Sequence, residues 1–139
     1  MEKVKQPRAF YGSFFHTPEY GSFEYLERAL IEVGEDGAIE RVIAHDDPDQ
    51  AAALAKAREA GTLYELGEGR FGLPGFVDIH IHSPQWPQAA LALDEPLYRW
   101  LDERTFPLES KFADVDFAKE VYSDLVDQLL ARGSTTAVY

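Results

Sequence analysis

Two histidines separated by one residue are the side chains of this sequence that could most directly do chemistry. His80 and His82 follow an apolar run that begins at Phe76 and is typical of a strand. Residues two apart on a strand point to the same face, so the two imidazoles project side by side. Two neutral imidazoles at this spacing can bind one metal ion, at roughly 2.0–2.1 Å for zinc. We therefore predict that His80 and His82 are metal ligands, with Asp78 one step back on the same face.

The alternative is a buried histidine pair that is satisfied by the backbone and binds no ligand. With four histidines in 139 residues, such a tripeptide is expected by chance roughly 0.1 times. The position of the pair favours a metal site, because it opens into a long loop, Ser83 to Val115. In parallel α/β barrels this edge of the sheet carries the active site. His16 lies in an expected turn and His45 at an expected strand end, and we assign neither a role.

The order of elements from Phe76 onward predicts one βαβ unit. Its expected parts are a buried strand over Phe76–His82, a short helix over Leu97–Glu103, a helix over Phe117–Arg132 and a strand over Thr135–Tyr139. The main helix has apolar residues every four positions from Phe117, with Asp116 as the expected N-cap and Gly133 after its end. Strands joined in this way are parallel. A single unit leaves the faces of its strands uncovered, so we expect it to be an incomplete part of a larger α/β fold.

The first seventy residues predict a small, mostly β region. Strands are expected over Ala9–Phe15, Leu26–Val33, Ala38–Ala44 and Thr62–Leu66, with a helix over Asp49–Ala60 that Gly61 ends. Glycine and proline then crowd into positions 67–75, which is typical of a boundary. We therefore divide the chain into residues 1–70 and residues 71–139.

Composition narrows the classes of protein that remain. The net charge is −12, which opposes binding to nucleic-acid phosphates and to anionic membranes. The sequence has no cysteine, so disulfides and thiolate metal sites are excluded. No apolar run approaches the ~20 residues that span a bilayer. We predict a cytoplasmic protein with no nucleic-acid or membrane partner.

The residues around the histidine motif resemble those of a known family. The run from Leu73 to His82, LPGFVDIHIH, resembles the signature of the amidohydrolase superfamily. The resemblance implies the first strand of a distorted (β/α)8 barrel, preceded by part of a small β-sandwich domain. It also implies that His80 and His82 bind the catalytic metal, which would be zinc or iron. Ile79 replaces a threonine that is often found before the first histidine.

The residues after the histidines are similar to those of the guanine deaminases within that superfamily. The likeness covers the run from His80 to Trp86, HIHSPQW, and continues through Thr105-Phe106-Pro107, Glu109, Phe112, Asp116-Phe117-Ala118 and Gly133-Ser134-Thr135. It implies guanine as substrate, xanthine and ammonia as products, and a possible homodimer of the full-length protein. His82, Ser83, Pro84 and Gln85 would line the purine site. Gln85 would pair with the lactam edge, and Trp86 and Phe106 could stack on or wall the base.

The same resemblance implies that further ligands and a proton-shuttling carboxylate come from later barrel strands. We therefore expect no catalytic residue in this chain beyond the two ligands, and no activity from it alone. The carboxylates Asp94, Glu95 and Glu109 receive no role. Two alternatives stay open: another amidohydrolase that acts on a different nitrogen heterocycle, and a non-catalytic, stand-alone binding protein.

Overall fold

The computed structural model describes residues 6–139, which form two compact units that divide between Pro74 and Gly75. The boundary between the units lies at Pro74, four residues after the boundary predicted at residue 70. Each unit is described by itself below.

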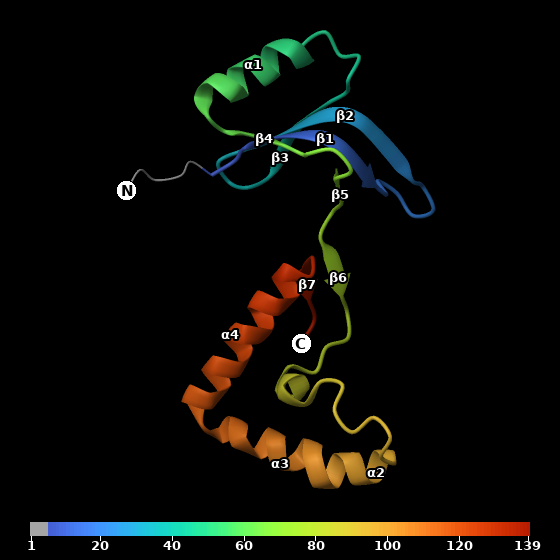
Figure 1. Ribbon diagram of the computed structural model, residues 1–139, viewed down its shortest axis with the longest axis vertical. Coiled ribbons are helices and arrows are strands. Elements are labelled where there is room, and N and C mark those ends of the chain that lie inside the picture. Colours follow the sequence, from blue (N-terminus) through green and yellow to red (C-terminus); the bar gives the residue numbers. More distant parts are fainter. Residues whose placement is uncertain (1–5) are drawn as a thin grey trace. The chain divides into compact units, whose positions relative to one another are not determined.

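The first unit is a five-stranded sheet with one helix (Figure 1). Its elements are β1 (Ala9–His16), β2 (Glu24–Val33), β3 (Ile39–Ile43), α1 (Gln50–Ala60), β4 (Leu63–Glu65) and β5 (Phe71–Gly72). The strand order is β3-β2-β1-β4, and β5 also pairs with β1. Strands β1, β2 and β3 are antiparallel, whereas β4 and β5 run parallel to β1. The strands and the helix predicted for this region are confirmed; its membership of a sandwich stays a prediction.

The core of the first unit lies between the sheet and α1. Its buried residues are Ala9, Leu30, Ile43 and Ala57, with Tyr11, Ala53, Leu54 and Leu63 packed against them. The helix ends as predicted at Gly61, whose φ of 68° is left-handed, a conformation that glycine adopts without steric cost.

A buried amide joins α1 to the sheet. Gln50 is the first residue of α1, and its Nε2 donates to the carbonyl oxygens of Arg28 (2.8 Å), Ala44 (2.9 Å) and Ile43 (3.2 Å). Arg28 has a left-handed φ of 45° at an irregularity in the pairing of β1 with β2, so its carbonyl lies outside the regular ladder. The Gln50 amide therefore ties the start of α1 to the end of β3 and to the irregular part of β2, and the Ala44 carbonyl also accepts from the backbone N–H of Asp47 at 3.2 Å.

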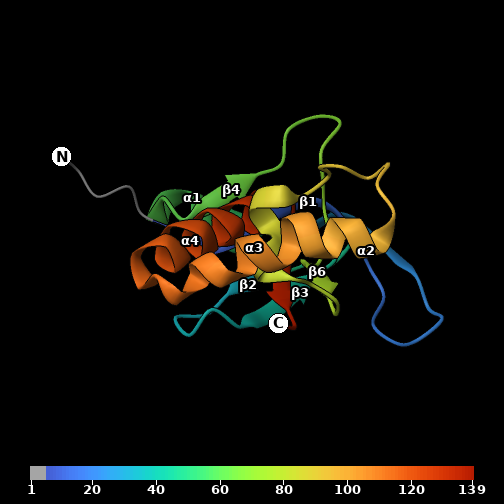
Figure 2. The same ribbon diagram turned by 90° about the horizontal axis from the view of Figure 1, so that it is seen from below.

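The second unit contains a two-stranded parallel sheet and a series of helices (Figure 1). Its elements are β6 (Phe76–Asp78), the 3-10 helix η1 (Ser83–Gln88), α2 (Leu97–Trp100), the π-helical turn η2 (Leu101–Thr105), α3 (Phe106–Glu109), the 3-10 helix η3 (Ser110–Ala113), α4 (Val115–Ala131) and β7 (Ser134–Ala137). The pairing of β6 with β7 is parallel, as predicted. The short helix predicted over Leu97–Glu103 is present as α2 and η2, but the prediction of a long loop over Ser83–Val115 is wrong, because most of this segment is helical. Figure 2 shows these helices from below.

The predicted strand over Phe76–His82 is too long and is not buried. It ends at Asp78, whose carboxylate oxygen accepts a hydrogen bond from the backbone N–H of His80 at 3.0 Å. Such a local bond competes with the strand ladder and turns the chain. Phe76, Val77 and Ile79 are 56%, 62% and 78% exposed. Within the described residues β6 pairs with β7 alone, so little covers these side chains.

Helix α4 begins two residues earlier than predicted. The carboxylate of Asp114, not that of Asp116, caps it by accepting from the backbone N–H groups of Asp116 (2.9 Å) and Phe117 (3.3 Å). The predicted apolar face is confirmed, with Val121 and Leu125 buried. The predicted glycine after its end, Gly133, has a φ of 90°.

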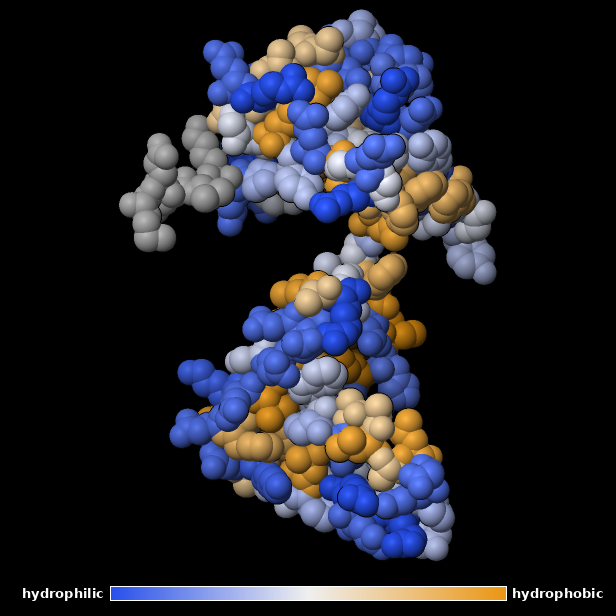
Figure 3. Space-filling model, viewed as in Figure 1, coloured by the Kyte–Doolittle hydropathy of each residue, from blue (hydrophilic) through white to orange (hydrophobic). Residues whose placement is uncertain are grey.

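Large apolar side chains remain at the surface of the second unit (Figure 3). The exposed residues are Phe76, Val77, Ile79, Leu91, Leu93, Leu97, Tyr98, Phe106, Val115, Tyr122, Val126, Leu130, Val138 and Tyr139. Uncovered faces of this kind are expected of one βαβ unit taken from a larger parallel sheet. Within residues 6–139, no helix has the length and apolar character needed to cross a membrane.

The cap at Asp114 predicts a difference between two neighbouring aspartates. We expect Asp114→Ala to lower the free energy of unfolding by about 1 kcal/mol, because two helix N–H groups lose their acceptor. Asp116→Ala removes the same charge and no cap, so its effect should stay within about 0.5 kcal/mol. Urea unfolding of the two variants measures both values. An equal loss in both would contradict the assignment of the cap.

The bridge made by Gln50 predicts a larger effect. Gln50→Glu keeps the size of the side chain but removes the N–H donors, so three carbonyl oxygens face a carboxylate. We expect the free energy of unfolding to fall by about 3 kcal/mol, the upper range for a buried unsatisfied polar group. The exposed Glu59→Gln, the reverse change on the same helix, should stay within about 0.5 kcal/mol. Urea unfolding checks this, and an unchanged midpoint for Gln50→Glu would refute the bridge.

Candidate functional site

The two histidines of the motif lie side by side at the surface, between the end of β6 and the start of η1. Their Nε2 atoms are 3.0 Å apart and their ring centroids 5.0 Å apart. Two nitrogens that each lie 2.0–2.1 Å from a tetrahedral zinc ion are separated by about 3.3 Å. The pair therefore fits two adjacent positions of one metal ion with a small adjustment.

Asp78 does not add a third ligand in this arrangement. Its carboxylate accepts from the backbone N–H of His80 and so is turned toward the chain. Among the described residues, no three histidine, aspartate or glutamate side chains converge on a point that could hold a metal ion. A closed site needs four ligands in zinc proteins, and a catalytic site needs three. The histidine pair therefore supplies two of the four ligands of a closed site, or two of the three protein ligands of a catalytic site.

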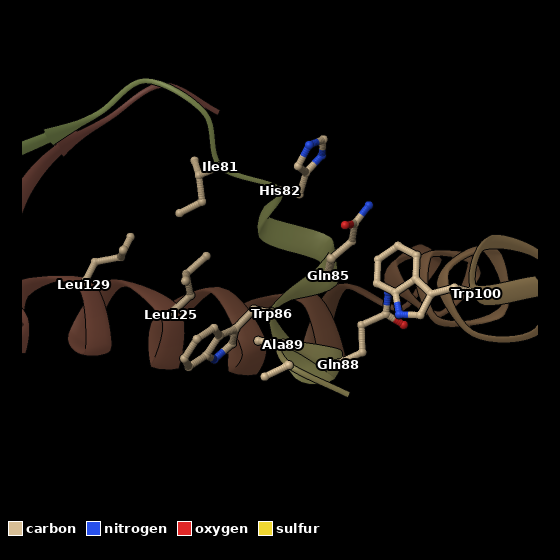
Figure 4. A pocket seen from close by; sticks show the side chains of 10 residues that line it. Ile81, His82, Gln85, Trp86, Gln88, Ala89, Trp100, Leu125 and Leu129 are labelled. Atoms are coloured by element: carbon tan, nitrogen blue, oxygen red, sulfur yellow. The ribbon is translucent and has the colours of Figure 1, made fainter. Parts of the chain in front are cut away.

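A cavity of about 340 Å³ lies next to His82 (Figure 4). Its walls are Ile81, His82, Gln85, Trp86, Gln88, Ala89, Ala90, Trp100, Leu125 and Leu129. Figure 4 shows that η1 crosses the middle of this site, with Leu125 and Leu129 contributed by α4 and Trp100 by α2. The lining is mostly apolar with a few amide and imidazole groups, which is the usual composition of a small-molecule pocket.

Two glutamine side chains attach η1 to the neighbouring helices. Gln88 Nε2 donates to Thr105 Oγ1 at 2.7 Å, and these residues are only 7% and 1% exposed. Gln85 Nε2 donates to Glu109 Oε1 at 3.1 Å. On the other side, Trp86 Nε1 donates to Asp124 Oδ2 of α4 at 2.7 Å. The helix that carries the pocket residues is thus held from both sides.

The four residues predicted to line a purine site are in different environments. His82 and Gln85 line the cavity, whereas Ser83 and Pro84 do not. Ser83 is 9% exposed, and its hydroxyl has no hydrogen-bond partner among the described residues. Of the two predicted aromatic walls, Trp86 lines the cavity; Phe106 is exposed and does not.

Part of the pocket was not predicted from the sequence. Trp100, Leu125 and Leu129 line it, but nothing in the local pattern separates them from ordinary helix residues. Glu109 received no role, although it contacts Gln85 from 24 positions away. His16, also given no role, pairs with Glu24 across β1 and β2 at 3.0 Å. That contact lies in the first unit.

Ion pairs brace the helical run that carries Thr105. Arg104 contacts Glu95 at 2.6 Å, and Arg99 contacts Glu103 one turn along the helix at 3.0 Å. The hydrogen bond from Arg104 holds the pKa of Glu95 below its ordinary value of 4.5. The hydrogen bond from Arg99 lowers the pKa of Glu103 in the same way. Both pairs are accessible to solvent, so salt screens them.

The comparisons with known proteins point to one group. No protein-family model matches the chain. A guanine deaminase from Dictyostelium discoideum is 35% identical over 147 aligned positions, covering 100% of this chain and 32% of its own length. The human guanine deaminase is 36% identical over 132 positions, covering 94% of this chain and 28% of its own. The crystal structure of a guanine deaminase from C. acetobutylicum with bound guanine superimposes with a TM-score of 0.70 at 29% identity, covering 94% of this chain and 29% of that one.

All of these matches are to guanine deaminases, and the solved structure shares the mixed α/β fold of this chain. The chain is similar to these guanine deaminases over 94% to 100% of its own length. It spans less than a third of the length of the relatives named above.

The ion pairs predict a pH dependence. Because the pKa of Glu95 is lower in the folded state than in the unfolded state, the pair stabilises the fold above pH 4.5. That contribution falls as the pH drops through the folded-state pKa. We expect carboxyl carbon NMR to give a midpoint below 4.5 for Glu95, and Arg104→Gln to move it upward. A midpoint that does not move in this variant would rule out Arg104 as the cause.

Proposed function

We propose that this chain is the segment of a guanine deaminase that supplies two metal ligands and part of the purine pocket. The whole enzyme would hydrolyse guanine to xanthine and ammonia. The observation that carries the proposal is the similarity to guanine deaminases along the entire chain. It is supported by the adjacency of the paired imidazoles to the pocket that contains Gln85.

His80 and His82 would hold the metal through their Nε2 atoms, which face each other. A zinc ion is the group that best suits two neutral imidazoles in a hydrolase, and iron is the alternative. When bound, zinc lowers the pKa of a water molecule from ~15.7 toward ~7 and so supplies hydroxide at neutral pH. The remaining ligands would come from residues outside this segment. In the proposed fold, β6 and β7 are the first two strands of a (β/α)8 barrel. The full-length enzyme would be cytoplasmic and would form a homodimer.

The pocket side chains would position the base. Gln85 carries a donor and an acceptor on one planar amide, which matches the N1–H donor and the 6-oxo acceptor of a lactam. Adenine presents the opposite pattern at these positions and would be disfavoured. Trp86 and Trp100 line the same cavity and would keep water from the faces of the base. The proton transfers to the departing ammonia would need a carboxylate from another segment.

Metal removal tests the proposal on the full-length protein. We expect production of xanthine from guanine, no reaction with adenine, and loss of activity after dialysis against a chelator. Zinc should restore the activity. His80→Ala and His82→Ala should each reduce kcat/KM by about a thousandfold or more, because an incomplete zinc site holds its ion weakly. Liquid chromatography of the products and metal analysis of the variants measure both effects.

The control is His16→Ala, which removes an imidazole far along the chain from the motif and should leave activity and metal content unchanged. Xanthine production that survives complete metal removal would contradict the metal role. Activity on another nitrogen heterocycle with none on guanine would instead support a different amidohydrolase. A full-length protein that is folded and inactive on every such compound would support a binding protein.

A further inference from the structure

Among the described residues, the Glu109 side chain has one hydrogen-bond partner, the amide of Gln85. Glu109 is the last residue of α3, and its Oε1 accepts from Gln85 Nε2 at 3.1 Å. Both residues are half-buried. Within residues 6–139, no arginine, lysine or histidine lies within ion-pair distance of this carboxylate. Its interaction is therefore directed at the pocket residue and not at a surface cation.

The chemistry of the pair allows one orientation of the amide. An ionised carboxylate only accepts hydrogen bonds, whereas the amide of Gln85 has a donor end and an acceptor end. The donor end must face Glu109, and a reversed amide would place two oxygens against each other. The Oε1 atom of Gln85 and its second N–H then remain for a ligand in the cavity that Gln85 lines.

A second hydrogen bond keeps the two helical segments in register. Gln85 and Gln88 are three residues apart on a 3-10 helix, which has three residues per turn, so they share a face. Thr105 and Glu109 are four residues apart on the facing helical run and also share a face. The buried bond from Gln88 to Thr105 at 2.7 Å therefore fixes the position of η1 along the facing helical run, so that Gln85 lies opposite Glu109.

We propose that Glu109 is a positioning residue that fixes the polarity of the Gln85 amide and thereby the order in which the pocket reads the lactam edge of a purine. The inference rests on the proposed function, because it assigns the ligand of Gln85 as a lactam. A lactam presents N1–H beside an oxo group, so its recognition depends on which end of the amide faces which atom. An amide that is free to flip would offer the mismatched order part of the time.

The test uses the full-length protein and compares two glutamate-to-glutamine variants. Glu109→Gln keeps the size of the side chain, but its amide can pair with either end of Gln85. We expect KM for guanine to rise about tenfold, the scale of one hydrogen bond to a charged group, with little change in kcat. Glu120→Gln makes the same change of charge at an exposed position of α4 that does not line the cavity. This control should leave KM unchanged.

Two readouts separate positioning from a general structural effect. The inhibition constant of 2-aminopurine, which has no 6-oxo group and an N1 acceptor in place of N1–H, should not rise in Glu109→Gln. In a Gln85→Ala background, Glu109→Gln should have no further effect on KM, because the two residues act as a unit. Glu109→Asp keeps the carboxylate and should lie between the wild type and Glu109→Gln. It keeps the test informative if the glutamine variant is unstable.

The outcomes also separate this inference from the proposed function. A wild-type protein that does not deaminate guanine would overturn both. Deamination that Gln85→Ala weakens and Glu109→Gln leaves intact would overturn the positioning role alone. An equal loss from Glu109→Gln in the presence and absence of the Gln85 amide would show a structural role and would also overturn it.

Discussion

The arrangement of the pocket depends on one buried hydrogen bond, from Gln88 to Thr105. Breaking it would leave an amide and a hydroxyl buried without partners, which costs far more than the bond itself contributes. The bond therefore fixes η1 against the helical run that contains Thr105. From that fixed point, Gln85 meets Glu109 and Trp86 reaches Asp124. The chain segment that follows the histidines is held as a short rigid helix, not as a loop.

Patterns of neighbouring residues predicted the helices and turns that are stabilised by contacts between residues close in sequence. The four-residue apolar period located α4, and the glycine signals located the ends of α1 and α4. The hairpin between β2 and β3 followed from its turn residues. The spacing of His80 and His82 likewise implied adjacent ring nitrogens, and the structure brings these nitrogens to 3.0 Å.

Features that depend on distant partners could not be read in this way. The contact between Gln85 and Glu109 joins residues 24 positions apart, and the contact between Trp86 and Asp124 joins residues 38 apart. The early end of β6 has a local cause, the hydrogen bond from the backbone N–H of His80 to the Asp78 carboxylate. The sequence does not show whether this carboxylate accepts from the backbone or binds a metal ion. The helical turns over positions 83–113 lack a long apolar period, because each is too short to show one.

The placement of the two tryptophans has an optical consequence. The chain has two tryptophans, and both line the same cavity, Trp86 beside α4 and Trp100 from α2 (Figure 4). The fluorescence of the indoles in this segment, excited selectively, therefore reports on the surroundings of the pocket and not on the rest of the segment. The indole N–H of Trp86 faces a carboxylate and that of Trp100 faces a backbone carbonyl, so the two emitters experience different local fields. A ligand that enters the cavity would change their emission without any attached dye.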